Sequence, residues 1–284
     1  MKTQVVVKGY KIEQLIEEDS FRNIYQAVHL PSSKQVFMTV ISVHSHRDQN
    51  ALKKRALLSQ KLNLPSLQTA LDYGILPNQV FFFTHEQIPS LSIHRVLSEI
   101  NDPLDRLYEL SSLMIKALEI LAYIHDASLS HRNLQSPQLR VTNSKQILLE
   151  GFINPRQKIE SQNLSTKVHL PYHAPEQLLG SPCDRKTDLY SMGVIFYELC
   201  TGNFPYNSNY QKIDDAKKSM SPSLSGIEPA LPLAIERIIM RSLCPRKNRY
   251  SYARDWIDDL EAFRNSRPLK KKFSDSLKHF FSLS

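Results

Sequence analysis

Four short stretches between residues 131 and 194 decide the fold of this chain. They read HRNLQSPQ at His131–Gln138, EGF at Glu150–Phe152, APE at Ala174–Glu176 and TDLYSMGV at Thr187–Val194. Their order, their spacing and the apolar residues on either side of them form one specific pattern. Because the pattern is intact across more than sixty residues, it indicates a complete scaffold rather than an isolated motif.

This pattern resembles the eukaryotic-type Ser/Thr protein kinase family, whose matching motifs are HRDxKxxN, DFG, APE and DxYSxG. The resemblance covers roughly residues 10 to 265. It implies an α+β, bilobal fold, in which a small antiparallel β upper lobe with one helix joins a larger, mainly α-helical lower lobe. We expect the upper lobe over residues 1–88, the lower lobe over 89–266 and a separate tail over 267–284. The glutamine after APE is similar to bacterial members of the family.

Composition fits one globular protein of moderate size. The chain has 284 residues, of which 41% are hydrophobic and 23% charged, as in ordinary soluble proteins. Only 7 residues are glycine, whereas average usage would give roughly 20. A chain that wraps its backbone around a triphosphate would be expected to use more glycine than this.

Charge and cysteine content limit the partners and the compartment. The net charge is +8, but the positive residues are scattered, so we expect no nucleic-acid partner. Cys183, Cys200 and Cys244 are widely spaced and odd in number, which predicts neither a disulfide framework nor a zinc site. The first residues lack the apolar run of a signal peptide, and no stretch approaches ~18 apolar residues. We therefore expect a cytoplasmic protein.

Hydrophobic periodicity predicts strands in the first ninety residues and mostly helices thereafter. The predicted strands are Tyr10–Leu15, Asn23–Val28, Gln35–Val43 and Val80–Phe83, and the predicted helices are Asn50–Leu62, Leu104–Ile124, Asp188–Leu199, Pro232–Leu243 and Tyr252–Phe263.

The family's glycine-rich phosphate loop matches Ile16–Arg22, which has no glycine. Glu17, Glu18 and Asp19 place three negative charges where phosphates would sit, which opposes phosphate binding. Arg22 replaces the third glycine, where with-no-lysine kinases carry the lysine that substitutes for the missing strand residue. Arg22 could hold an anion in the cleft; alternatively, it is exposed or paired with its acidic neighbours.

The VAIK motif of the family aligns with Val36–Thr39. Thr39 stands where the phosphate-pairing lysine would be, and a hydroxyl cannot supply that cation. Phe37 replaces the small alanine against which adenine lies, so we expect its ring to fill the adenine slot; the alternative is that the ring turns outward. Glu86 and Ile88, in the predicted connection between the lobes, are the remaining candidates for contact with a nucleotide.

The remaining catalytic positions of the family are also replaced. Arg55 aligns with the helix glutamate that pairs with the lysine, and Asn133 stands in place of the aspartate base. An amide does not accept a proton at neutral pH, and that role is commonly worth ~10²- to 10⁴-fold in rate. Gln138 replaces the metal-binding asparagine and Glu150 the DFG aspartate. Because Mg²⁺ demands near-ideal octahedral geometry, we expect no metal site and no catalytic residue.

Residues that are structural in the family are retained. Glu176 and Arg249 match the pair that forms a buried salt bridge in the lower lobe. Asp188 matches the residue that accepts hydrogen bonds from the backbone of the catalytic loop, at His131 and Arg132. These residues would stabilise the fold whether or not the protein is a catalyst.

The tail beyond residue 267 has the pattern of a short basic amphipathic helix. It is a candidate for peripheral contact with an acidic membrane surface or for a partner groove; alternatively, it packs on its own lower lobe or frays. The residues that would make the membrane contact are Leu269, Phe273, Leu277 and Phe281 with Lys270, Lys271 and Lys272.

The resemblance and the replaced residues together predict a pseudokinase that acts as a regulatory scaffold through a protein partner. In this interpretation no cofactor is expected. The first alternative is a weak or unconventional ATP-binding Ser/Thr kinase that uses Arg22 and Glu150. A second alternative is a nucleotide sensor without turnover, in which occupancy of the cleft shifts a conformational equilibrium.

Overall fold

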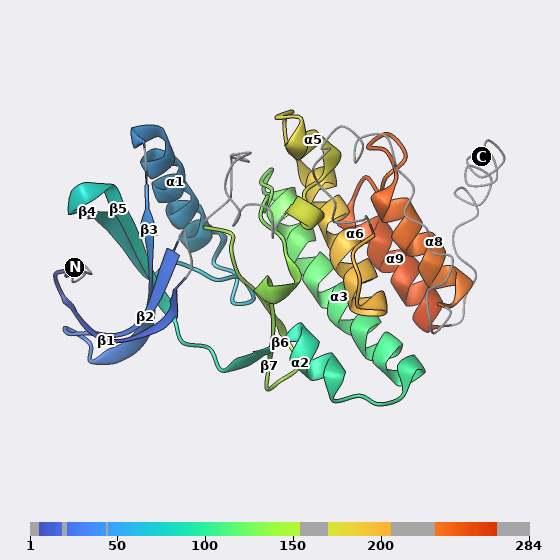
Figure 1. The fold of residues 1–284 in the computed structure, drawn as a ribbon, viewed down its shortest axis with the longest axis horizontal. Helices are drawn as coiled ribbons and strands as arrows, with labels where there is room; N and C mark the ends of the chain where they lie inside the picture. The colour runs from blue at the N-terminus through green and yellow to red at the C-terminus, as the bar shows by residue number, and fades with distance from the viewer. Residues whose placement is uncertain (1–5, 19–21, 44, 154–169, 206–230, 266–284) are drawn as a thin grey trace. The chain divides into compact units, whose positions relative to one another are not determined.

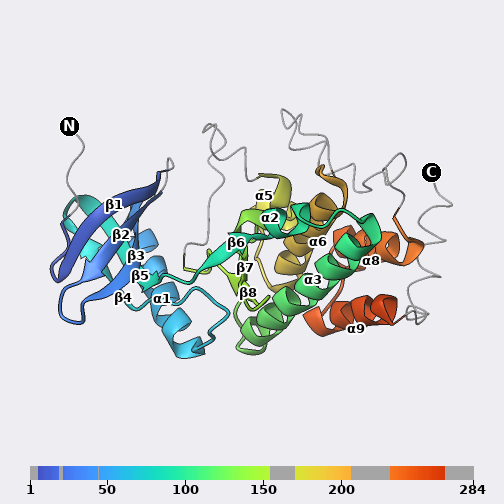
Figure 2. The same ribbon diagram turned by 90° about the horizontal axis from the view of Figure 1, so that it is seen from below.

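The computed structural model describes residues 6–18, 22–43, 45–153, 170–205 and 231–265 (Figures 1 and 2). The chain divides into two compact units. The first unit comprises residues Met1–Ser92 and Gln138–Gln157, and the second comprises Ile93–Pro137 and Lys158–Ser284. The α+β fold expected from the sequence is confirmed, because the first unit is built on antiparallel sheets and the second is mainly helical.

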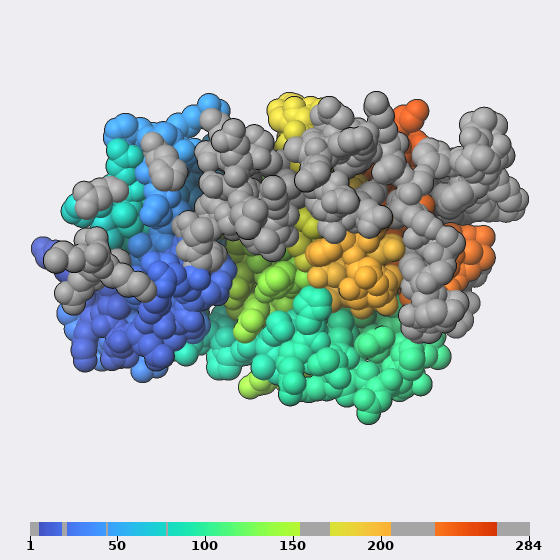
Figure 3. All heavy atoms as spheres, in the orientation of Figure 1, coloured from blue at the N-terminus to red at the C-terminus, as the bar shows by residue number. Residues whose placement is uncertain are grey.

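The first unit contains a five-stranded antiparallel sheet in the order β1-β2-β3-β5-β4. Edge strand β1 is mostly exposed, and its atoms lie at the visible surface in Figure 3. The predicted strands are all present; one further strand, β4, is short and was not predicted because its five residues contain a glycine and little alternation. The strands are β1 (Tyr10–Glu18), β2 (Arg22–His29), β3 (Lys34–Ser42), β4 (Asp72–Leu76) and β5 (Val80–Glu86), and a 3₁₀ turn, η1 (Pro77–Gln79), joins the last two.

Helix α1 (His46–Leu62) covers one face of this sheet. Successive side chains of a strand point to opposite faces, so β3 contributes to two apolar clusters. One cluster contains Val36, Met38 and Val40 with Ala27 and Phe82. The other contains Ile41, Phe81 and Phe83 with Leu52 and Ala56 of α1.

Helix α1 begins four residues earlier than the sequence pattern predicted. Ser45 is its N-cap, and the Ser45 hydroxyl oxygen accepts a hydrogen bond from the Asp48 N–H at 3.1 Å. The apolar periodicity starts only at Leu52, which is why the first turn was missed. The helix ends at Leu62, and its C-cap, Asn63, adopts the left-handed conformation (φ 46°).

A small antiparallel sheet completes the first unit. Its strands are β6 (Ser90–Ser92), β7 (Leu139–Thr142) and β8 (Ile147–Leu149), in that order. The Leu149 N–H donates to the Ser66 carbonyl at 2.8 Å, and the Leu149 carbonyl accepts from the Gln68 N–H at 2.9 Å. These bonds place Glu150–Phe152, the residues that follow β8, beside the segment between α1 and β4.

The helices of the second unit pack around α6, which is buried nearly all round, as its apolar sequence predicted. The first turn of α6 is capped by Asp184, whose carboxylate accepts from the Lys186 N–H at 2.9 Å. The helix stops at Gly202 (φ 72°). The helices are α2 (Ile93–Ser98), α3 (Pro103–Asp126), α5 (Pro175–Leu178), α6 (Arg185–Thr201), α8 (Leu233–Leu243) and α9 (Ala253–Arg264), with 3₁₀ turns η2 (Ser136–Gln138) and η3 (Leu170–Tyr172).

Asp188 organises the loop after α3, as predicted. It is 1% exposed and accepts hydrogen bonds from the backbone N–H groups of His131 and Arg132, each at 2.7 Å. His125 Nε2 lies 2.9 Å from the same carboxylate. Burial alone would raise the pKa of Asp188, but the hydrogen bond and charge of His125 and the backbone donors hold it below its ordinary value. These bonds hold Arg132 in the left-handed region (φ 68°), which is costly for a residue with a side chain.

The predicted pair of Glu176 and Arg249 is also confirmed. Arg249 Nη1 lies 2.8 Å from Glu176 Oε1, and both side chains are buried. Burial would raise the pKa of Glu176, but the hydrogen bond and charge of Arg249 outweigh it and lower that pKa. Removing one partner of such a buried pair is strongly destabilising because it leaves an uncompensated charge.

Contact between α6 and α8 gives a first prediction. A Cβ atom at Gly193 would collide with the Ser242 hydroxyl and lie 2.8 Å from the Ser242 Cβ. We expect Gly193→Ala to lower the free energy of unfolding by about 1–3 kcal/mol, as overpacking of a core does. Urea denaturation measures the change.

Ser242→Gly provides the control through a double-mutant cycle. Because it removes the atoms that the new methyl group meets, the two substitutions together should cost less than the sum of their separate effects. Strictly additive effects would show that the two helices do not meet at this point.

Candidate functional site

The positions that match the nucleotide site of the family belong to both units. In the first unit, Phe37 and Thr39 lie on the same face of β3, as strand alternation predicted, opposite His85 and Phe83 of β5. The Phe37 ring is half-buried, and its centroid lies 5.7 Å from that of the His85 ring. Its occupation of an adenine slot stays a prediction.

Thr39 of β3 is buried, and its side chain makes no hydrogen bond with any described residue. It is 2% exposed, and its hydroxyl oxygen has no hydrogen-bond partner within the described part of the chain. A buried hydroxyl without a partner costs free energy. The position that holds the phosphate-pairing lysine in the family is therefore occupied here by a small, neutral and unsatisfied group.

Arg55 of α1 binds the Glu150–Phe152 stretch. Its Nε donates a hydrogen bond to the Phe152 carbonyl oxygen at 2.7 Å, and its guanidinium carbon lies 3.9 Å from the centroid of the Phe152 ring. Arg55 is 8% exposed and Phe152 is fully buried. A desolvated cation–π contact contributes about 2 kcal/mol or more. Arg55, which stands at the position of the family's helix glutamate, thus contacts the carbonyl and the ring of Phe152 instead of pairing with a lysine.

A chain of hydrogen bonds runs from Gly151 to the end of β5. The Gly151 N–H donates to Gln68 Oε1 at 3.3 Å, Gln68 Nε2 lies 3.1 Å from His85 Nε2, and His85 Nδ1 lies 3.2 Å from the Glu86 carbonyl oxygen. An amide nitrogen can only donate, so His85 Nε2 accepts and Nδ1 carries the proton donated to Glu86. Each of the three hydrogen bonds then has one donor and one acceptor.

Gln68 and His85 were missed by the sequence analysis. The available signal was weak: His85 is a polar residue at the end of a strand that is otherwise largely aromatic. Burial lowers the pKa of His85 to about 4, although the Glu86 carbonyl acts to raise it, and the charge of Arg22 lowers it further. His85 is therefore neutral at pH 7, as the hydrogen-bond directions require.

Glu150 keeps a carboxyl group but in an environment that disfavours its charge. Burial raises its pKa, the charges of Arg140 and Arg22 act in the opposite direction, and Glu17 raises the pKa again. Arg22 Nη2 forms an ion pair with Glu17 Oε1 at 2.9 Å. Arg22 therefore pairs with an acidic neighbour, as one of the two alternatives for this residue predicted. Its positive charge also acts to lower the pKa of Glu150. Asp19 lies outside the described residues.

Gln138 packs against Gly151. Gly151 has φ +85°, which favours glycine, and a Cβ there would lie 2.7 Å from Gln138 Cδ. The Gln138 carbonyl accepts from the Glu150 N–H at 3.0 Å, whereas its side-chain Oε1 is buried without a partner in the described chain. The Gln138 side chain, which replaces the metal-binding asparagine of the family, thus packs against the backbone of Gly151.

In the second unit, two of the replacement residues bond to each other. Gln135 Nε2 donates to Asn133 Oδ1 at 3.1 Å, and both side chains are buried. The Asn133 N–H donates to His131 Nδ1 at 3.3 Å. Asn133 and Gln135 stand at the positions of the aspartate and the lysine in the family's HRDxKxxN motif, so the two replacement amides form one local network.

The remaining candidates for nucleotide contact lie at the end of β5 and just beyond it. Glu86 is the last residue of β5 and is exposed; Ile88 is half-buried, and its carbonyl accepts from the Ser90 hydroxyl at 3.2 Å. Among the described residues, no group of three or more His, Cys, Asp or Glu side chains is arranged to hold a metal ion.

The predicted tail contacts, Leu269 to Phe281 and Lys270 to Lys272, lie outside the described residues. None of the helices in residues 6–265 that the structure describes has both the length and the apolar composition of a bilayer span.

Comparison with known proteins identifies the family. The protein kinase domain model matches residues 10–269, so the chain belongs to the protein kinase family. It is 21% identical to the probable serine/threonine-protein kinase PknB of Corynebacterium glutamicum, over 91% of this chain and 42% of that protein. It is 22% identical to the serine/threonine-protein kinase PrkC of Bacillus subtilis, over 93% and 42% respectively. The chain thus spans less than half the length of these curated relatives.

Solved structures agree on the fold. The kinase domain of Mycobacterium tuberculosis PknI superimposes with a TM-score of 0.73 at 17% identity, over 94% of this chain and 99% of that one. The expected kinase-like fold is confirmed, and the bacterial Ser/Thr kinases among the relatives confirm the expected family.

The Arg55 contact gives a second prediction. Arg55→Met keeps much of the apolar volume but removes the guanidinium, and with it the hydrogen bond from Arg55 Nε to the Phe152 carbonyl. We expect a loss of about 2–4 kcal/mol in the free energy of unfolding, measured by urea denaturation.

Arg55→Lys is the matched variant for that measurement. It keeps the charge but not the planar group that can stack and donate at the same time, so it should recover only part of the loss. Wild-type stability in Arg55→Met would show that the contact contributes nothing.

The buried His85 gives a third prediction, on pH. Because its folded pKa of about 4 is below the ordinary 6.5, the unfolded chain binds a proton between these values that the folded chain does not. The free energy of unfolding should therefore fall as pH is lowered from about 6.5 to about 4, by about 3 kcal/mol in total. Denaturation curves at several pH values measure it.

His85→Gln isolates this contribution from that of other titrating groups. A glutamine amide can accept from Gln68 and donate to the Glu86 carbonyl but does not titrate. The variant should lose less stability than the wild type over the same pH interval; parallel curves would contradict the assignment to His85.

Proposed function

We propose that this chain is a pseudokinase, a protein-kinase fold that transfers no phosphate and acts as a regulatory scaffold for another protein. The observation that carries the proposal is the contact of Arg55 with the carbonyl and the ring of Phe152. In place of a lysine–glutamate pair that would hold phosphates, the first unit has a neutral buried Thr39 and an arginine bonded to Phe152.

The residues present do not fit magnesium-bound ATP. Phosphoryl transfer in this family needs cations at the phosphates, metal ligands and a carboxylate that positions the substrate hydroxyl. Thr39 supplies no cation, burial raises the pKa of Glu150 and so disfavours the charge that a metal ligand needs, and Asn133 Oδ1 already accepts from Gln135. The replacements support a site that has been rebuilt as a packed interior.

Retention of the structural bonds supports a role for the fold itself. Asp188 still organises the loop that carries Asn133, and Glu176 still pairs with Arg249. A kinase fold that keeps its structural hydrogen bonds and ion pair but lacks the groups for phosphoryl transfer can still act through its surface. For this reason we propose a protein partner in the cytoplasm.

A second candidate is a weak, unconventional Ser/Thr kinase. One observation favours it: the positive charge of Arg22 acts on both Glu150 and His85, so the arginine is near the groups that would face a nucleotide. The ion pair with Glu17 at 2.9 Å opposes this role because it already occupies part of the guanidinium.

Nucleotide binding and phosphate transfer test the proposal, as a fourth prediction. Thermal denaturation with ATP, with and without Mg²⁺, should show no shift, whereas a site at 100-fold excess over Kd would add about 2.7 kcal/mol. No label should pass from γ-labelled ATP to protein substrates or to the chain itself. Asn133→Asp should not restore transfer, because Thr39 still supplies no cation.

Other outcomes separate the alternatives. Label transfer that Arg22→Ala abolishes would establish the unconventional kinase and overturn the pseudokinase. A thermal shift with ATP but without product would establish a nucleotide sensor. A partner captured equally by the wild type and Asn133→Asp, with or without ATP, would agree with the scaffold.

A further inference from the structure

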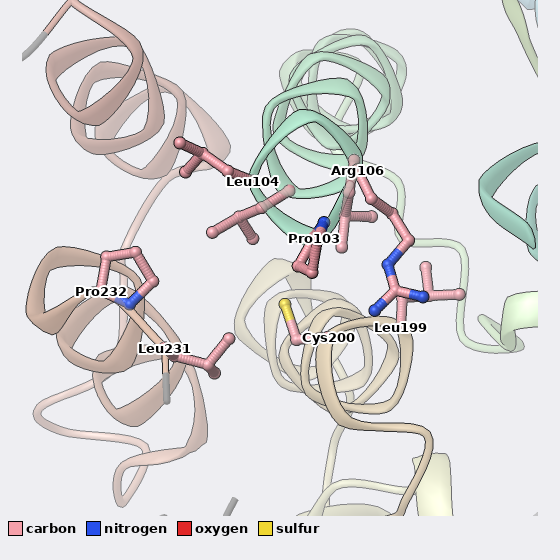
Figure 4. Close-up of a pocket in the computed structure, with 9 residues that line it drawn as sticks. Pro103, Leu104, Arg106, Leu199, Cys200, Leu231 and Pro232 are labelled. Atoms are coloured by element: carbon pink, nitrogen blue, oxygen red, sulfur yellow. The ribbon is translucent and has the colours of Figure 1, made fainter. Parts of the chain in front are cut away.

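An apolar pocket lies within the second unit, and none of the replaced catalytic positions lines it. It is formed by the first turns of α3, the last turn of α6 and the residues just before α8 (Figure 4). Its walls include Leu104, Leu107 and Leu110 of α3 with Leu199 and Cys200 of α6 and Leu231. The cavity measures about 160 Å³.

The chemistry of the walls is apolar. Leucine and proline side chains make up most of them, and a free cysteine behaves as a small hydrophobic group. Burial raises the pKa of the Cys200 thiol, although the charge of Arg106 opposes this, so the sulfur is an uncharged part of the wall. An apolar cavity of about 150 Å³ can stay dry and bind a molecule such as benzene.

Among the described residues that line the pocket, Arg106 has the one cationic side chain. It extends from α3 toward Leu199 in the last turn of α6 (Figure 4), where the helix dipole favours a positive charge. The side chain is half-buried, and within the described part of the chain its guanidinium makes no hydrogen bond or ion pair. Its planar N–H groups match the geometry of a carboxylate.

We propose that this pocket binds a medium-chain carboxylate, with the aliphatic chain between α3 and α6 and the carboxylate on Arg106. The volume limits the buried part to a short chain, on the order of six carbons. Each methylene group that enters strengthens binding by about fourfold. The Leu104 residue in the pocket wall is 52% exposed, so the aliphatic chain of the ligand can enter the cavity beside it.

The probe is octanoate, titrated into the whole 284-residue chain by calorimetry beside octanol and octylamine. Octanoate should bind most tightly and octylamine least, because only the carboxylate pairs with Arg106. Arg106→Gln should weaken octanoate by roughly tenfold or more and leave octanol unchanged. Arg237→Gln is the matched control, since it removes an exposed arginine of α8 that does not line the pocket.

Two blocking variants locate the binding. Cys200→Phe fills the cavity, and Leu104→Trp narrows its half-exposed side at a position where folding is less at risk. Both should abolish binding of octanoate and octanol, with circular dichroism showing that the fold is kept. Vesicles of anionic phospholipid form a parallel arm: binding to them that the same variants abolish would assign the acyl chain to a lipid rather than to a free acid.

Three results would overturn the proposal. They are the absence of octanoate binding in calorimetry, equal affinity for octanoate and octanol, and binding that neither blocking variant reduces. Binding of a peptide with the sequence of residues 266–284, together with no binding of octanoate, would assign the pocket to the chain's own tail and would also reject the proposal.

Discussion

The first unit depends on the partners of one buried cation. A guanidinium removed from water must have its charge and its N–H groups satisfied, and Arg55 finds the Phe152 carbonyl at 2.7 Å and the Phe152 ring at 3.9 Å. This contact joins α1 to the residues after β8, two segments nearly a hundred positions apart in the chain. With Phe152 held, Gly151 is in place to donate to Gln68, and the hydrogen bonds continue through His85 to the end of β5.

The replacement of chemical groups follows the same principle in both units. Where the family has charges that meet a nucleotide, this chain has groups that meet each other: Arg55 with Phe152, Gln135 with Asn133, and the Gln138 amide against Gly151. Such internal partners lower the cost of burying polar atoms. Thr39 and Gln138 are exceptions, since the Thr39 hydroxyl and the Gln138 Oε1 have no hydrogen-bond partner in the described chain. The exchange supports a packed interior in place of a binding site.

The bonds that support the kinase fold are independent of these replacements. Asp188 accepts from the backbone of its loop whether residue 133 is an aspartate or an asparagine, because it bonds the main chain at His131 and Arg132. Glu176 pairs with Arg249, and neither residue is one of the replacements. Membership of the protein kinase family and the absence of its chemical groups are therefore compatible, since different residues determine each.

The sequence by itself determined the family, four strands of the large sheet, the five longer helices, and the two structural constellations around Asp188 and Glu176, because periodicity and motif spacing are properties of neighbouring residues. The short elements β4, β6, β7, β8, α2 and α5 were not predicted. The sequence also named Thr39, Arg55 and Asn133 as replaced, but not what they would contact. The bond of Arg55 to Phe152, the chain through Gln68 and His85, and the pocket beside Arg106 were decided only by the tertiary structure. Each of these features joins residues that are far apart in the sequence, and such a contact leaves no local sequence pattern. Which residues meet depends on which surfaces the packed helices and strands bring close to each other.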